Sequence, residues 1–73
     1  MEDFLIEKIE ELTFTKVTVD ELLWESRILD SITIVELVVE IEGEFSITVP
    51  FNEIIVENFE TVSNMMRYID SKK

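Results

Sequence analysis

The sequence predicts an all-α domain: a small bundle of three main helices plus one short helix, with a long loop between the first two main helices. Apolar residues recur at steps of three and four over residues 2–12, 31–44 and 62–70, which is the period of an amphipathic helix. Residues with short polar side chains stand directly before the second and third of these segments, where such residues cap helices. The length suits one small domain and is too short for two, so we expect a single domain over residues 1–73.

The first helix is expected over residues 2–12, with an apolar face formed by Met1, Leu5, Ile9 and Leu12. The connection over residues 13–30 begins with residues of strand-like propensity. A single short strand here would lack a stable sheet, because even two short strands rarely stand alone. We therefore expect an ordered loop instead. Asp20 is expected to cap a short turn over residues 21–24. For Trp24 we favour an anchoring role over stacking on a ligand. The apolar residues expected to hold the loop and turn in place are Phe14, Val17, Val19, Leu22, Leu23 and Trp24.

The second helix is expected to run from Ser31 to Gly43 or Glu44. Asp30 and Ser31 are both helix-capping types, because a short side-chain oxygen can accept from the unpaired amides of the first turn. A serine hydroxyl is therefore expected at the positive end of a helix dipole, where a phosphate group is favoured. A helix cap with no further role is the alternative interpretation of these two residues. The apolar stripe facing the core would contain Ile32, Val35, Leu37, Val38, Ile41 and Phe45.

The last third of the chain predicts a short helix followed by a longer one. Asn52 is expected to cap the short helix over residues 53–57, and Thr61 the final helix over residues 62–70. The residues expected to turn inward are Ile54, Ile55, Phe59, Val62, Met65, Met66 and Ile69, with Tyr68 beside them.

The composition excludes several classes of function. The net charge is −11, from 17 acidic and 6 basic residues, which disfavours nucleic acid and anionic membranes and favours electropositive protein partners. Cys and His are both absent, so the chain lacks disulfides, thiolate metal sites and the commonest general base. We see neither a membrane-spanning segment nor a signal peptide, and therefore expect no membrane insertion and a cytoplasmic protein.

Glu36, Glu40 and Glu44 recur every four residues along one side of the second helix. They could together bind a hard cation, but they lack the tight loop of a calcium site, so we favour a solvated acidic face. An enzyme would need a nucleophile with a base, a metal site, or two carboxylates of opposed pKa. The sequence therefore predicts no enzyme.

A family resemblance is carried by residues 23–37, which read Leu-Trp-Glu-Ser-Arg-Ile-Leu-Asp-Ser-Ile-Thr-Ile-Val-Glu-Leu. This run resembles the acyl and peptidyl carrier proteins, which have an aromatic residue, acidic residues, Leu-Leu-Asp-Ser-Leu and then a helix with Val-Glu-Leu. After that helix the family often has Glu-Phe, an Ile, an apolar residue and Pro. Residues 44–50 read Glu-Phe-Ser-Ile-Thr-Val-Pro, so the resemblance covers nearly the whole chain.

The resemblance implies that Ser31 is esterified by 4'-phosphopantetheine, donated by coenzyme A through a phosphopantetheinyl transferase. Asp30 would be the motif acid that helps to position the serine and the metal of the transferase. The thiol of the arm would carry an acyl or aminoacyl group as a thioester. The implied partners are that transferase, a loading ligase or synthetase, and downstream acyl-transfer enzymes. The carrier itself is expected to be a monomer.

The resemblance also implies a docking face for partner enzymes on the second helix. Glu36 and Glu42 match acidic positions that carriers often present to basic patches. Ile34 and Val39 are expected on the less buried side of the helix, where carriers often show apolar contacts. Ordinary core burial is the alternative for these two apolar residues.

Two positions depart from the family pattern. Ile32 replaces the usual Leu, which is a mild change of shape. Arg27 stands where many relatives have Gly, so the loop before Ser31 could bend differently, or the guanidinium could pair with the phosphate of the arm. The Leu-Asp-Ser form without a preceding Gly looks closer to stand-alone aminoacyl carriers, including the D-alanyl carrier, than to the fatty-acid carrier.

A second functional hypothesis is a small acidic adaptor or inhibitor that works with Ser31 unmodified. The two hypotheses differ in their response to Ser31→Ala, which should abolish a carrier and leave the binding of an adaptor intact.

Overall fold

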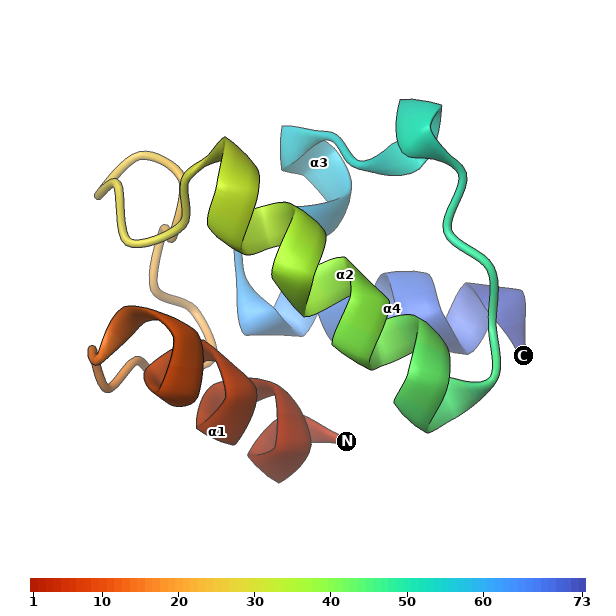
Figure 1. The fold of residues 1–73 in the computed structure, drawn as a ribbon, viewed down its shortest axis with the longest axis horizontal. Helices are drawn as coiled ribbons and strands as arrows, with labels where there is room; N and C mark the ends of the chain where they lie inside the picture. The colour runs from red at the N-terminus through yellow and green to blue at the C-terminus, as the bar shows by residue number, and fades with distance from the viewer.

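The computed structural model describes residues 1–73 and contains helices without any strand (Figure 1). The elements in chain order are α1 (Glu2–Thr13), α2 (Ser31–Phe45), the 3-10 turn η1 (Phe51–Glu53), α3 (Val56–Phe59) and α4 (Val62–Lys72). The predicted all-α fold, with its long connection between the first two main helices, is confirmed. None of the helices is long and apolar enough to pass through a membrane.

The three long helices surround one core. α1 contacts both α2 and α4, and the short α3 packs against α4. In Figure 1 the connection over residues 14–30 leads from the end of α1 to the start of α2, and residues 46–50 lead from the far end of α2 to η1. The first turn of α2 therefore lies at an edge of the bundle, close to the connection and to η1.

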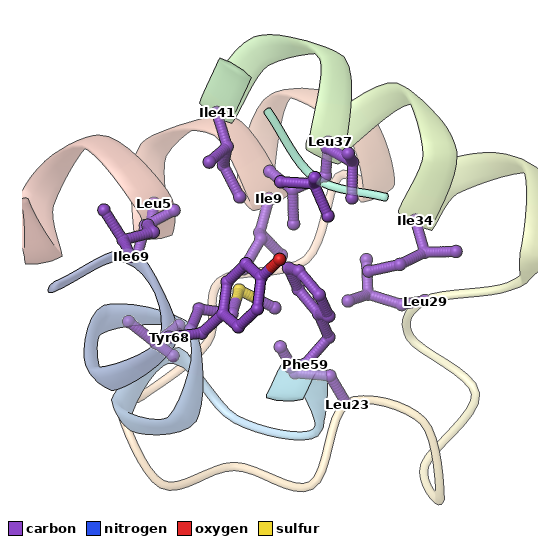
Figure 2. Packing of buried hydrophobic residues seen from close by; sticks show 14 of the residues in the cluster. Leu5, Ile9, Leu23, Leu29, Ile34, Leu37, Ile41, Phe59, Tyr68 and Ile69 are labelled. Atoms are coloured by element: carbon purple, nitrogen blue, oxygen red, sulfur yellow. The ribbon is translucent and has the colours of Figure 1, made fainter. Parts of the chain in front are cut away.

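The core is a single cluster of 15 buried apolar residues, most of which Figure 2 shows as sticks. The rings of Phe59 and Tyr68 lie at its centre, with their centroids 5.3 Å apart. Burial of large apolar side chains is the main favourable term in folding, so this cluster holds the bundle together. The fully buried residues from the helices include Leu5 and Ile9 of α1, Leu37 and Ile41 of α2, and Met65 and Ile69 of α4.

The inward face of α2 differs from the predicted stripe. Ile32 is 71% exposed and Val35 is also exposed, whereas Ile34 is only 5% exposed and belongs to the core. The prediction was wrong here because Leu37, Val38 and Ile41 fix the face that points inward. On a helix of 3.6 residues per turn, Ile34 lies one turn before Leu37 and Val38, and Ile32 and Val35 fall away from that face.

The end of α2 lies further along the chain than predicted. The helix continues through Gly43 to Phe45, and Ser46 then adopts a left-handed conformation with φ 55°. Such a residue commonly terminates a helix, because it turns the chain away from the helix axis.

The connection is an ordered loop, as predicted, but two of the apolar residues expected to anchor it, Phe14 and Leu22, are exposed. Val17 is buried and Val19 packs against the core, whereas Phe14 is 92% exposed. Phe14 ends α1 with φ 57°, and its N–H donates to the carbonyl oxygen of Glu10 at 2.8 Å. The left-handed backbone turns the ring out of the bundle.

Asp20 does not cap a turn over residues 21–24. Its carboxylate instead accepts a hydrogen bond from the hydroxyl of Ser63 at 3.1 Å, which ties the connection to the start of α4. The observed turn covers residues 23–27. Of its predicted anchors, Leu23 is fully buried, whereas Leu22 is exposed.

The predicted helix over residues 53–57 is also wrong. The chain forms η1 directly after Pro50 and then the four-residue helix α3, and Asn52 makes no capping hydrogen bond. Ile55 interrupts the two turns with an extended backbone, and it is exposed rather than turned inward.

The cap of the last helix is confirmed. The side chain of Thr61 accepts the backbone N–H of Asn64 at 3.0 Å. The helix continues to Lys72, whose ammonium group forms an ion pair with Glu53 at 2.8 Å. Glu53 also accepts a hydrogen bond from the hydroxyl of Tyr68, so η1 is fastened to α4.

Candidate functional site

The first turn of α2 is closed by the side chain of Asp30. Its Oδ1 atom accepts the backbone N–H groups of Ile32 at 3.1 Å and Thr33 at 2.8 Å. These hydrogen bonds, with that to Thr33 as the largest cause, lower the pKa of the Asp30 carboxyl below its ordinary value. The predicted N-cap is therefore confirmed for Asp30.

Ser31 is the first residue of α2 and is exposed. Its hydroxyl makes no hydrogen bond within the chain, so an approaching enzyme can reach it. Two amides of the first turn are already taken by Asp30, so a phosphate on Ser31 would be favoured by the helix dipole rather than by these two donors. No histidine is present in the chain to deprotonate the hydroxyl.

The loop before the site bends sharply at Arg27, which has φ 64°. Glycine adopts this conformation most readily, so the Arg at this position still forms a glycine-type bend. Two backbone hydrogen bonds hold the bend, from Arg27 N–H to the carbonyl oxygen of Trp24 and from Leu29 N–H to that of Leu23. Leu29 is buried and holds the end of the loop in place, so the positions of Asp30 and Ser31 at the start of α2 are fixed.

A partly open cavity of about 390 Å³ lies directly beside Ser31. Residues of the connection, of α2 and of the segment around η1 form its lining. They are Trp24, Leu29, Asp30, Ser31, Ile34, Val35, Phe51 and Ile54. The cavity could not be predicted from the sequence, because Trp24 and Val35 lie 27 and 16 residues before Phe51 along the chain.

Trp24 belongs to the lining of this cavity as well as to the core region. Its backbone N–H donates to Oε1 of Glu60 at 2.9 Å, which anchors the residue as predicted. Its indole Nε1 is buried and has no hydrogen-bond partner. Buried N–H groups are nearly always paired, so this unpaired donor is an exception within the structure.

The four residues expected to form the docking face of α2 lie in different surroundings. Glu36 is exposed and Val39 is 59% exposed, as expected. Ile34 is buried, so its expected position on the less buried side is wrong. Glu42 is half-buried, and its Oε2 accepts the backbone N–H of Val49 at 2.8 Å, so it fastens the segment after α2 to the helix.

The acidic series along α2 does not converge on a common point. Glu36, Glu40 and Glu44 are all exposed, and no group of three acidic side chains is arranged to hold a metal ion. Glu40 lies 3.7 Å from the ammonium group of Lys8 on α1. Exposed ion pairs of this kind add little stability.

Comparison with known proteins decides the family. The family described as "Phosphopantetheine attachment site" matches residues 29–69, which is more than half of the chain and includes Ser31. The chain belongs to this carrier-protein family. It is 37% identical over 68 residues to the D-alanyl carrier protein of Streptococcus suis (strain 05ZYH33), covering 90% of this chain and 86% of the relative.

A second relative is the D-alanyl carrier protein of Streptococcus pyogenes serotype M5 (strain Manfredo). It is 33% identical over 72 residues, covering 96% of this chain and 91% of the relative. The expected carrier function is thus confirmed: the protein tethers acyl or aminoacyl groups on a phosphopantetheine arm, and it interacts with transferases and ligases.

The residues around the start of α2 fit this prosthetic group. An exposed, unpaired hydroxyl is present at Ser31, and an apolar cavity adjoins it. Trp24 also belongs to the lining of this cavity. An arm that combines methyl groups with amide carbonyls is chemically suited to such a lining.

Proposed function

We propose that Ser31 is the residue to which 4'-phosphopantetheine is attached, through its Oγ atom. The observation that carries this assignment is the exposed and unpaired hydroxyl at the first position of α2. The neighbouring carboxylate of Asp30 is engaged in the helix cap and leaves the hydroxyl free. A rigid helix start thus presents the oxygen in one defined place.

In the attachment reaction, the Ser31 oxygen forms a bond to the phosphorus that bears the pantetheine group of coenzyme A. The phosphoanhydride bond breaks, and adenosine 3',5'-bisphosphate leaves with the bonding electrons. The serine proton passes to a base of the transferase. The exposed side of Asp30 is the natural contact for the metal ion of that transferase.

In this proposal the chain acts as a carrier, and its partner enzymes perform the chemistry. A tethered substrate still serves catalysis, because the tether raises its effective concentration at the active site of a partner. The thiol of the bound arm supplies the thioester linkage for the cargo.

We further propose that the cargo is an aminoacyl group of the D-alanyl type, as the names of the two relatives suggest. The specific partners would be a ligase that activates the amino acid and an acyltransferase that removes it. Both would work with the carrier in the cytoplasm, where coenzyme A is the donor of the arm. The test is to measure thioester formation on the carrier that already bears the arm, with D-alanine, ATP and such a ligase. The yield is compared with that of the same reaction with L-alanine.

Partner enzymes are proposed to dock on the exposed side of α2. Glu36 and Val39 are its central members, because they are exposed and lie three residues apart on one side of the helix. Glu42 adds charge at the edge of this face, although its hydrogen bond to Val49 also gives it a structural role. The net charge of −11 favours encounter with a basic patch.

The attachment assignment is tested by intact mass after incubation with coenzyme A and a broad-specificity phosphopantetheinyl transferase. We expect the wild type and Ser26→Ala to gain one arm, and Ser31→Ala to gain none. Ser26 is a suitable control because it is an exposed serine of the same loop. If folded wild-type protein gained no mass with several transferases, the acidic adaptor would be the better description.

A further inference from the structure

The six basic residues of the chain fall into two groups. Four of them are engaged within the chain by an ion pair, a hydrogen bond or an aromatic ring, namely Lys8, Arg67, Lys72 and Lys73. The other two, Lys16 and Arg27, form no ion pair, although the chain has 17 acidic residues. Both are exposed and lie in the connection between α1 and α2. Of the two, Arg27 is the one that stands directly before the site at Ser31.

The backbone at Arg27 is held in a conformation that disfavours an arginine. Its φ of 64° lies in the left-handed region, where a residue with a Cβ atom is strained and glycine is not. The bend is fixed before residue 27 by the Ser26 hydroxyl, which donates to the carbonyl oxygen of Leu22 at 2.6 Å. It is fixed after residue 27 by the N–H of Leu29, which donates to the carbonyl oxygen of Leu23 at 3.0 Å. An arginine here therefore costs stability that a glycine would not.

No ion pair within the chain offsets the cost of Arg27. The nearest carboxylates along the chain belong to Glu25 and Asp30, and neither pairs with the guanidinium. Asp30 instead accepts amides of the first turn of α2. Strained residues cluster at functional positions, where the strain is kept for the sake of a contact with another molecule. The strain at Arg27 thus points to a contact outside the chain.

Arg27 lies inside the area that an enzyme must cover to reach Ser31. Only four peptide units separate the two residues, so their Cα atoms are at most about 15 Å apart. A standard protein interface covers about 800 Å² on each partner, which corresponds to a circular patch of about 16 Å radius. An enzyme whose docking surface is centred on Ser31 therefore meets Arg27 within that surface.

We propose that Arg27 is a specificity contact for the ligase that loads the arm, and that its guanidinium pairs with a carboxylate on the docking surface of that enzyme. A guanidinium binds a carboxylate through two parallel hydrogen bonds, so the pair fixes direction as well as distance. A charge enclosed in an interface without a partner is costly, so the enzyme has to supply the acid. This inference rests on the proposed carrier function and on attachment at Ser31.

The charges on the two sides of Ser31 have opposite signs. Arg27 stands four residues before it and Glu36 five residues after it, and both are exposed. The charged residues of α2 are all acidic, and a basic patch can accept such a helix in more than one orientation. A positive charge before the helix removes this ambiguity, because the wrong orientation brings like charges together. The arm then enters the enzyme from one direction.

The ligase reaction tests this contact on carriers that already bear the arm. Wild type, Arg27→Gly and Arg27→Glu are loaded to completion with coenzyme A and a broad-specificity phosphopantetheinyl transferase, and intact mass confirms one arm on each. The kcat and KM of the ligase for each carrier are then measured with D-alanine and ATP. We expect Arg27→Gly to raise KM about tenfold with little change in kcat, and Arg27→Glu to raise KM further. Both effects should shrink at high salt.

Unfolding in urea separates a contact with the ligase from a structural role of Arg27. Relief of the left-handed strain outweighs the added freedom of the unfolded chain, so Arg27→Gly should raise the urea midpoint. This variant is therefore expected to be more stable than the wild type and yet a poorer substrate. A lowered midpoint together with a raised KM would assign a structural role to Arg27 and refute the contact.

Lys16→Glu is the matched control for Arg27→Glu. Lys16 is the other exposed basic residue of the connection without an ion pair, and its substitution changes the net charge by the same amount. We expect Lys16→Glu to leave the KM of the ligase at the wild-type value. Equal effects of the two substitutions would assign the loss to net charge and refute a specific contact.

The remaining outcomes separate this inference from the proposals on which it rests. If the ligase accepts the loaded wild type and Arg27→Gly with the same KM, the contact is refuted while attachment and cargo stand. If the transferase loads no carrier, or the ligase rejects the loaded wild type, the attachment or the cargo assignment fails and this inference falls with it. A ³¹P resonance of the arm that differs between wild type and Arg27→Gly without ligase would place the guanidinium on the arm's own phosphate and overturn the contact with the enzyme.

Discussion

The carboxylate of Asp30 accepts the backbone N–H of Thr33 at 2.8 Å, and this contact closes the first turn of α2 immediately beside the hydroxyl of Ser31. One residue therefore has two roles that can be separated. Its oxygen caps the helix, which any short acceptor can do, and its negative charge is available to a metal ion of a modifying enzyme.

Substitutions at Asp30 distinguish these two roles. Asn caps helices about as well as Asp, whereas Ala removes the acceptor. We expect Asp30→Asn to keep the urea midpoint of the wild type but to slow transfer of the arm, and Asp30→Ala to lower the midpoint and slow transfer as well. Urea unfolding and the rate of mass gain measure the two effects independently. Normal transfer to Asp30→Asn would show that only the cap matters.

The difference in burial between two isoleucines of α2 gives a prediction about stability, with the exposed one as the control. Ile34→Ala removes a side chain that is 5% exposed, and such truncations in a core cost about 2–5 kcal/mol. Ile32→Ala removes a side chain that is 71% exposed and should change stability by less than about 0.5 kcal/mol. Chemical denaturation followed by circular dichroism measures both. Equal losses in the two variants would contradict the observed orientation of α2.

The pH dependence of stability can be predicted from Glu53. Its carboxylate accepts from Lys72 and from the hydroxyl of Tyr68, and these hydrogen bonds lower the pKa of Glu53 below its ordinary value of 4.5. Because the folded state prefers the charged form, the stabilising effect is present above pH 4.5 and is lost as the pH falls through the lowered pKa.

Glu53→Gln provides the comparison for this effect. The stability difference between the wild type and Glu53→Gln should be constant from neutral pH down to about pH 5 and should shrink below pH 4.5. Urea unfolding at a series of pH values measures the difference, and the variant corrects for the other acidic groups. A difference that grows as the pH falls would mean that this network does not stabilise the folded state.

Because partner enzymes are proposed to dock on α2, a charge reversal on α2 should have a larger effect on them than a charge reversal on another helix. Glu36→Lys should lower the kcat/KM of the partner ligase for the carrier by about an order of magnitude, because it opposes a basic patch. Glu7→Lys on α1 changes the net charge by the same amount and should have little effect. Both glutamates are exposed, so neither change should unfold the protein. Equal losses would point to net charge rather than to a face.

The features that could be predicted from sequence are those made by neighbouring residues. The caps at Asp30 and Thr61 depend on contacts over two or three residues, and both are present. The apolar period also predicted the ends of α1 and α4 to within two residues. The motif around Ser31 identified the family for the same reason, since its residues are contiguous.

The features that could not be predicted depend on contacts between distant segments. Residues 32–39 of α2 are mostly apolar on every side, so the period alone did not decide whether Ile34 or Val35 turns inward. The exposure of Phe14 follows from a left-handed backbone that a phenylalanine rarely adopts. The place of Trp24 depends on Glu60, 36 residues away. The cavity beside Ser31 could be recognised only once these segments were assembled.

The most direct test of the central claim is to locate the arm on the chain. After loading with coenzyme A and a phosphopantetheinyl transferase, the intact protein should gain the mass of one arm, and fragmentation should place it on Ser31. The other serines, Ser26, Ser46, Ser63 and Ser71, serve as internal controls in the same spectrum. An arm found on any of these, or a folded protein that gains no mass, would contradict the assignment of Ser31 as the attachment site.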